Sequence, residues 1–167
     1  MRELLAESTG VPANPLDLIE EIVTSNDWAF DRTSDNELVA GIRGRWTEYD
    51  LFFAWREEMS LLQFCCACEM AVAAPRKAPV NELLSIANDK LWLGHFAVVP
   101  EDNLLTFRHA ILLRGARGAS VEQLEDLVDL AIAESDRFYP AFQFCIWGGK
   151  SPRDAITAAM LQPVGEA

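Results

Sequence analysis

The sequence predicts a single α+β domain in which an antiparallel sheet carries helices on one face. Two segments, residues 28–70 and 92–113, alternate apolar and polar residues as strands do. The other apolar segments repeat every three or four residues, which is the spacing of an amphipathic helix. The turns within the strand segments are short, so neighbouring strands are expected to pair antiparallel. A chain of 167 residues is long enough to bury one core without disulfides or metals.

The first half of the chain is expected to form a helix, four strands and a second helix. Asn14-Pro15 opens the first helix, because Asn caps well and Pro suits the first helical position. That helix runs to about residue 25 on an apolar stripe. The strands are predicted at 28–32, 37–46, 49–56 and 61–70, and the second helix at 80–91. Residues 1–14 are expected to form a flexible N-terminal arm, and residues 15–167 the single domain.

The second half is expected to form a hairpin followed by helices. The hairpin pairs residues 92–99 with 104–113. Ser120 and Gln123 form a capping box for the next helix, which Pro140 is expected to stop or kink. An apolar, aromatic segment continues to Trp147. The last helix starts at Ser151-Pro152 and runs to about residue 161.

Closing the strand turns gives testable registers. Turns at Thr47-Glu48 and at 57–60 align Ile42, Phe53 and Phe64 on one apolar face and set Arg45 opposite Asp50.

In the later hairpin, pairing Val99 with Leu104 places Trp92 on the apolar face. The same register sets His95 opposite Arg108, so His95 and His109 lie on opposite faces.

Charge and composition exclude several classes of protein. The formal net charge of −12 opposes general binding to nucleic acid or to anionic membranes. No apolar run approaches the ~20 residues of a membrane-spanning helix. The first residues are acidic where a signal peptide would be basic. A cytoplasmic protein with reduced cysteines is therefore expected.

Three motifs have the residue types of a reactive site but not its geometry. On a strand, Cys66 and Cys68 point away from Cys65, so the three thiols cannot converge on one metal ion. The two histidines lie on opposite faces. Gly148-Gly149-Lys150-Ser151 lacks the earlier glycine of a phosphate-binding loop, where Phe144 stands. No catalytic, cofactor-binding or metal-binding residue is therefore predicted, and the chain is not expected to be an enzyme.

The second face of the strand segment has the composition of an interface. It is apolar in the middle with arginines at its side, whereas a solvated face would alternate to polar residues. The alternative is that a helix of the same chain, such as the C-terminal one, covers it. The predicted protein-binding residues are Val39, Arg43, Arg45, Phe52, Ala54, Arg56, Leu61 and Cys65.

A series of aromatic and glycine motifs resembles one family of bacterial proteins. The strings are Trp92-Leu93-Gly94-His95-Phe96, Phe107-Arg108-His109-Ala110, Phe138-Tyr139-Pro140-Ala141-Phe142-Gln143-Phe144 and Trp147-Gly148-Gly149-Lys150-Ser151-Pro152, followed by the terminal Gly165-Glu166-Ala167. Together they resemble the YbjN-like family over residues 15–167. The resemblance implies a fold like the type III secretion chaperones, with a convex sheet, and a role as a sensory-transduction regulator. It supplies no catalytic residues.

These observations favour a homodimeric protein-binding module, chaperone-like or a regulatory adaptor, without a cofactor. The alternative is a sensory regulator that binds a small ligand between sheet and helices. The partner protein is not identified by any residue of the sequence.

Overall fold

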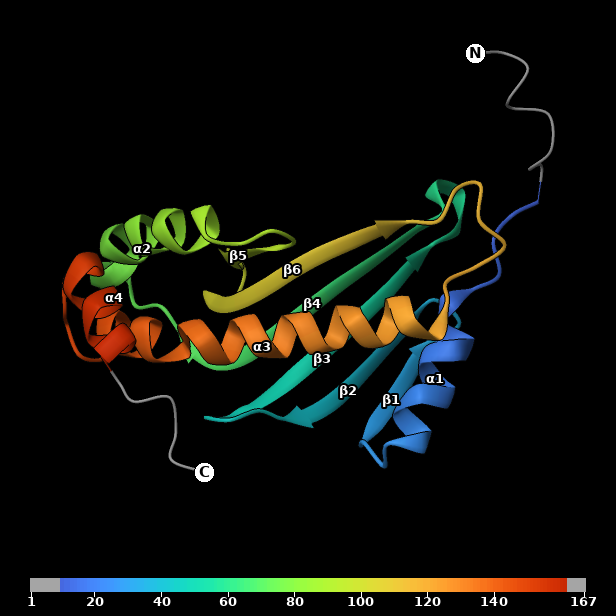
Figure 1. Cartoon of the computed structure of the whole chain (residues 1–167), viewed down its shortest axis with the longest axis horizontal. Helices are drawn as coiled ribbons and strands as arrows, with labels where there is room; N and C mark the ends of the chain where they lie inside the picture. Colours follow the sequence, from blue (N-terminus) through green and yellow to red (C-terminus); the bar gives the residue numbers. More distant parts are fainter. Residues whose placement is uncertain (1–9, 162–167) are drawn as a thin grey trace, which may run out of the picture.

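A six-stranded antiparallel sheet forms one side of the molecule (Figure 1). The computed structural model describes residues 10–161. The strands lie in the order β1-β2-β3-β4-β6-β5, so the last hairpin adds to the outer edge of β4. Their bounds are β1 (Phe30–Ser34), β2 (Glu37–Arg43), β3 (Glu48–Arg56), β4 (Leu61–Ala71), β5 (His95–Val98) and β6 (Leu104–Leu112).

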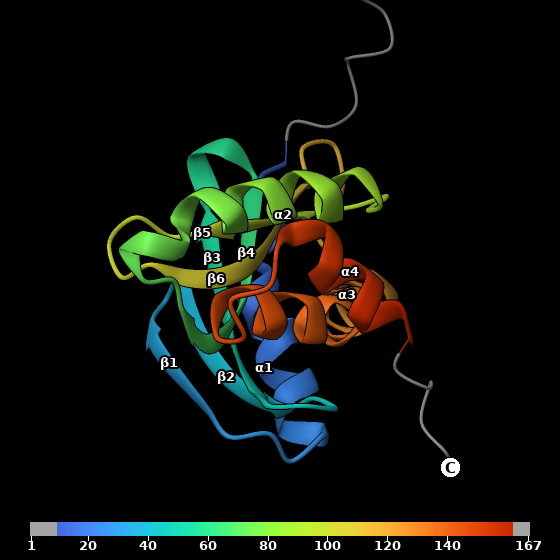
Figure 2. The same ribbon diagram turned by 90° about the vertical axis from the view of Figure 1, so that its left-hand side faces the viewer.

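The helices pack on one face of this sheet. They are α1 (Pro15–Ser25), α2 (Lys77–Asp89), α3 (Val121–Ile146) and α4 (Pro152–Leu161). In Figure 2, α1, α3 and α4 lie on one side of the sheet, and α2 lies against its β5 end. Two short 3-10 turns, η2 (Glu57–Met59) and η3 (Ala74–Arg76), follow β3 and β4. The predicted α+β class, with helices on one face of an antiparallel sheet, is confirmed.

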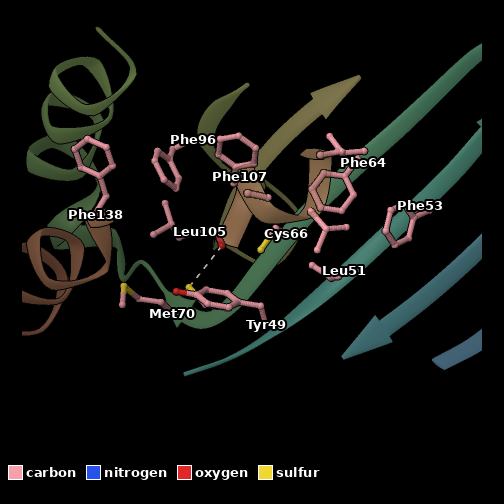
Figure 3. Close-up of a cluster of buried hydrophobic side chains, with 14 of the residues drawn as sticks. Tyr49, Leu51, Phe53, Phe64, Cys66, Met70, Phe96, Leu105, Phe107 and Phe138 are labelled. Carbon is pink, nitrogen blue, oxygen red and sulfur yellow. Dashed lines mark hydrogen bonds between the residues drawn. The ribbon is translucent and has the colours of Figure 1, made fainter. Parts of the chain in front are cut away.

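The core is an aromatic layer between the sheet and α3 (Figure 3). The Phe96 ring lies 5.5 Å from Phe107 on β6 and 5.6 and 5.3 Å from Phe138 and Phe142 on α3, between ring centroids. Such tilted and edge-on contacts add to the free energy gained by burial. They fix α3 across the middle of the sheet, so the strands β5 and β6 share one core with the first four.

Both predicted helix caps are present. The Asn14 side chain accepts a hydrogen bond from the Leu16 amide, and Ser120 and Gln123 form the reciprocal capping box. Of the predicted arm 1–14, residues 1–9 lie outside the described residues, and the Ala13 amide donates to the carbonyl of Arg117. The flexibility of this arm therefore stays a prediction.

Two of the three predicted registers are correct. Phe53 pairs with Phe64, and Phe96 pairs with Phe107. The β2–β3 register was wrong: Arg43 pairs with Glu48 and Gly41 with Asp50, so Arg45 lies in the turn at 44–47 and not opposite Asp50.

A contact from the distant helix α3 explains this longer turn. Both carboxylate oxygens of Asp136 accept the Arg45 amide at 3.0 Å, and Oδ1 also accepts the Tyr49 hydroxyl at 2.9 Å. A Cβ at residue 44 would overlap the Tyr49 ring and approach the Asp136 carboxylate to 2.9 Å, so the turn requires Gly44. The Asp136 clamp, as we call these contacts, holds the turn against α3.

A stop or kink was predicted at Pro140, but α3 continues through this residue to Ile146. Proline has no amide hydrogen, so it leaves the carbonyl four residues earlier without its helical donor. That carbonyl belongs to Asp136, and the Trp46 indole donates to it at 3.0 Å. The β2–β3 turn therefore supplies the hydrogen bond that Pro140 cannot make.

Helix residues contact both edge strands, α2 at β5 and α1 at β1. On β5, the Asn88 side chain accepts from the Phe96 amide at 2.7 Å and donates to the Phe96 carbonyl at 3.0 Å. On β1, Arg32 bridges to Asp17 and Glu20 of α1, both at 2.8 Å. The strand β5 is shorter than predicted: Trp92 lies in the preceding loop and is 99% exposed, so its predicted place on the apolar face was wrong.

Replacing Asp136 with Asn should destabilise the domain, because a charged acceptor of three hydrogen bonds is lost from a half-buried site. We expect the free energy of unfolding to fall by about 1–3 kcal/mol, and Tyr49→Phe to cost about 1 kcal/mol. Urea unfolding measures both. The double variant should cost less than the sum of the two, since they share one contact. Strict additivity would contradict the clamp.

Candidate functional site

The face of the sheet opposite the helices is the candidate functional site, and we call it the outer face. One row of paired residues crosses all six strands on it. The pairings run Asp31 to Val39, Val39 to Phe52, Phe52 to Cys65, Cys65 to Arg108 and Arg108 to His95. Because paired residues of antiparallel strands point to the same face, these six side chains form one continuous line.

The middle of the outer face consists of Phe52 and small apolar residues around it. Phe52 is 43% exposed, and a Cβ at Gly41 would meet no atom within 4 Å. Ala54 lies beside Phe52 along the strand, and Cys65 lies opposite it on β4. The helices of the described residues pack elsewhere, and α4 lies against α2 and α3. The interpretation that the C-terminal helix covers this face was therefore wrong.

Arginines surround the apolar middle but form few strong ion pairs. Arg43 approaches Glu48 at 3.9 Å with both side chains mostly exposed, and such pairs contribute little to stability. The Arg56 guanidinium donates to the Gln63 amide oxygen at 3.2 Å. Both arginine side chains are therefore held at the surface.

The structure places the predicted binding residues together, with one exception. Arg45 lies in the β2–β3 turn, and its guanidinium stacks 4.8 Å from the centre of the Trp46 ring. The others lie on the outer face of β2, β3 and β4: Val39, Arg43, Phe52, Ala54, Arg56, Leu61 and Cys65.

Sequence reasoning missed the contributions of β1, β5 and β6 to this face. Next to β4, a hollow is lined by side chains that include Gln63, Cys65, His95, Arg108 and Ala110. The His95–Arg108 pairing could be predicted from the local hairpin. The pairing of Arg108 with Cys65 could not, because β4 and β6 are separated by α2 and β5.

The cysteines divide between the two faces, as predicted. Cys66 and Cys68 are buried on the helix side, whereas Cys65 is half-buried on the outer face. Burial raises the pKa of Cys66 to about 12 and that of Cys68 to about 11. Burial also raises the pKa of Cys145. These three thiols are therefore protonated and unreactive at neutral pH.

The histidines lie on opposite faces at the free end of β5. His95 pairs with Arg108 on the outer face, and His109 pairs with Phe64 on the core face. Burial lowers the pKa of His109, and the charge of His95 lowers it further. Their faces are as predicted, yet the two rings influence each other across the edge of β6.

The turn after α3 uses its amides to end the helix. The Gly148 amide donates to Gln143, and the Lys150 amide donates to Phe144. Arg76 donates to the carbonyls of Cys145 and Lys150, both at 2.9 Å. These amides are therefore not free to surround a phosphate group.

Enclosed space in the described core is small. A void of about 10 Å³ lies between Tyr49, Cys66, Ser135 and Phe142, and this is room for about one water molecule. Among residues 10–161, no three His, Cys, Asp or Glu side chains converge where a metal ion could bind. None of the helices in the same residues has the length and apolar character needed to cross a membrane.

The domain is thus a single antiparallel sheet with helices on one face and an exposed, mixed apolar and arginine face on the other. Residues 15–144 match the YbjN family, described as "Putative bacterial sensory transduction regulator". The chain therefore belongs to the YbjN family, whose description is that of a regulator and not of an enzyme.

One solved structure supports the fold. It is the crystal structure of "YbjN, a putative transcription regulator from E. coli", with 14% identity and a TM-score of 0.53. The similarity covers 76% of this chain and 88% of that one. At this identity the likeness shows the fold alone. No curated protein matches the chain.

Thiol labelling should distinguish the outer-face cysteine from the buried ones. At pH 8 the native protein is expected to react with Ellman's reagent at Cys65 alone, because the other thiols are buried and hold raised pKa values. The Cys65→Ser variant is the control and should show no fast reaction. Denatured protein should react at all four thiols. Fast native labelling of Cys66 would contradict the assignment.

The stability of the domain should fall as the solution is acidified past the ordinary pKa of histidine. The folded pKa of His109 lies below its unfolded value of about 6.5, so the unfolded chain takes up the proton first. His109 therefore adds to the loss of stability as the pH falls below about 6.5. Urea unfolding at pH 7.5 and 5.5 should show a smaller loss for His109→Gln than for the unchanged protein. An equal loss in both would refute this.

Proposed function

We propose that this chain is a non-enzymatic protein-binding module, chaperone-like or a regulatory adaptor, that forms a homodimer and acts in the bacterial cytoplasm. The observation that carries the proposal is the exposed outer face centred on Phe52. An aromatic ring 43% exposed among small apolar neighbours, with arginines beside it, has the composition of interface centres.

Membership of a family of regulators supports this proposal, since a regulator acts through contacts with other molecules. The residue pattern of the outer face supports the proposal as well. A water-facing strand surface would alternate to charged residues, whereas Val39, Phe52, Ala54 and Cys65 form a continuous apolar centre. Covering that centre with a protein surface would remove apolar area from water.

The rival function, a sensor that holds a small ligand in its core, has less support. A pocket for a small molecule is typically about 300–1,000 Å³, whereas the void between the sheet and α3 is about 10 Å³. The hollow beside His95 and His109 is larger, about 400 Å³, but it is open to solvent and lies outside the core. The pKa values of the thiols that line it are raised, so they would not act as nucleophiles or metal ligands. The outer face therefore supports protein binding better than the core supports ligand binding.

Replacing Phe52 with Glu tests the proposal. A carboxylate at the centre of the outer face should abolish dimerisation and capture of partner proteins, because it would be desolvated on contact. Sedimentation velocity measures the first, and crosslinking pull-down read by mass spectrometry measures the second. The free energy of unfolding should change by less than about 0.5 kcal/mol, as for exposed positions generally.

Two further variants make the result specific. Trp92→Glu alters a ring that is 99% exposed off the outer face, and it should leave association unchanged. Trp147→Glu tests the turn after α3, whose ring is 56% exposed. If Phe52→Glu associates normally while Trp147→Glu does not, the binding surface is the turn and the proposal is wrong.

A further inference from the structure

The charges on the outer face are arranged unequally across the strands. The residue row has an acid at one end, Asp31 on β1, and bases at the other, Arg108 on β6 and His95 on β5. Glu37, exposed beside Val39 on β2, adds a second acid at the β1 end. Asp31, Glu37 and Arg108 form no ion pair within residues 10–161. Asp31 and Glu37 on one side of the face and Arg108 on the other therefore carry opposite charges that have no ion-pair partner in the described part of the chain.

The same row in a second copy, running in the opposite direction, has charges complementary to those of the first. Consider a two-fold axis in the interface that runs parallel to the strands, between β3 and β4. This axis places each strand opposite the strand of the second copy that lies equally far on the other side of the axis. The axis then sets β3 against β4 of the other copy, β2 against β6, and β1 against β5. Sheets that pack face to face keep their strands aligned to within about 30°. An aligned pair of this kind therefore preserves the correspondence.

We propose that the partner of the outer face is a second copy of this chain, packed sheet against sheet about this two-fold axis. This inference rests on the proposed function and names the arrangement of the dimer. In this dimer, Phe52 of one copy lies over Cys65 of the other. Arg108 of one copy lies over Val39 of the other, close to Asp31 and Glu37 of that second copy. The same contacts occur twice, as the symmetry of such a dimer requires.

The size of the face sets the strength of this association. Six strands about 4.8 Å apart span about 24 Å, and the paired rows extend about 20 Å along the strands. Each copy would thus cover about 500 Å², or about 1,000 Å² together, which is small for a stable dimer. The dimer should form reversibly with protein concentration and should be weakened by salt, since exposed charges contribute to it.

Charge reversal tests the arrangement. Arg108→Glu and Asp31→Arg should each raise the dissociation constant about tenfold or more, because each sets like charges together twice. The variant with both changes should recover most of the affinity of the unchanged chain. Matched controls with the same change of charge on the helices, Arg153→Glu on α4 and Asp129→Arg on α3, should have little effect. Sedimentation across a wide concentration range measures all five variants.

Cysteine pairing tests the axis directly. We would mix Val39→Cys/Cys65→Ser with Arg108→Cys/Cys65→Ser and treat the mixture with a short bismaleimide crosslinker, because facing sheets lie about 10 Å apart, too far for a direct disulfide. A crosslinked dimer should form in the mixture, whereas each variant alone should stay uncrosslinked, because identical positions lie about 17 Å apart across the axis. Crosslinking of either variant with itself would place the axis elsewhere and overturn the inference.

The outcomes separate this inference from the proposed function. A chain that is monomeric at every concentration but captures a different protein through Phe52 would refute the two-fold dimer and the homodimeric part of the proposed function, but it would leave the binding of a partner protein intact. A dimer that Phe52→Glu dissociates, but that neither charge reversal weakens, would also refute this arrangement. If Phe52→Glu changes neither association nor capture, both proposals are wrong.

Discussion

The Asp136 carboxylate is the contact on which the arrangement of sheet and helices depends. It joins α3 to a turn 91 residues away, through the Arg45 amide and the Tyr49 hydroxyl. Pro140 adds a second contact between the same helix and turn. It leaves the Asp136 carbonyl without a helical donor, and this carbonyl accepts a hydrogen bond from the Trp46 indole. The geometry of the turn ends β2 at Arg43 and so fixes the register of β2 on β3. That register determines which residues lie beside Phe52 on the outer face.

The outer face and the core face are consequences of the same pairing. Burial of Tyr49 beside Asp136 raises the pKa of its hydroxyl far above the ordinary value, so the ring stays neutral in the core. The alternate residues of the same strands, Asp50 and Phe52, must then face solvent. The helices use the core face completely, and this leaves the outer face available for contacts with other molecules.

Much of the fold could be predicted from local sequence, because caps and tight hairpins depend on neighbouring residues. Asn14, Ser120 and the Phe53–Phe64 pairing are examples. What failed depends on contacts distant in sequence. The predicted two-residue turn at Thr47-Glu48 did not take the contact with Asp136 into account. A stop or kink was predicted at Pro140, but α3 does not stop there, and Trp46 bonds the carbonyl that Pro140 leaves without a donor. The apolar centre of the site was predicted from β2–β4 alone, but its charged ends required the unpredictable pairing of β4 with β6.

The protection of the edge strands limits the kind of assembly that the domain can form. Asn88 occupies the backbone groups of Phe96, so a further strand cannot pair with β5 at that residue. At the other edge, the register irregularity of β1 and the Arg32 side chain directed to α1 hinder strand addition. Open sheet edges can add further molecules without limit, whereas a two-fold contact between faces closes with a pair. Edges blocked in this way oppose growth into fibres through strand pairing.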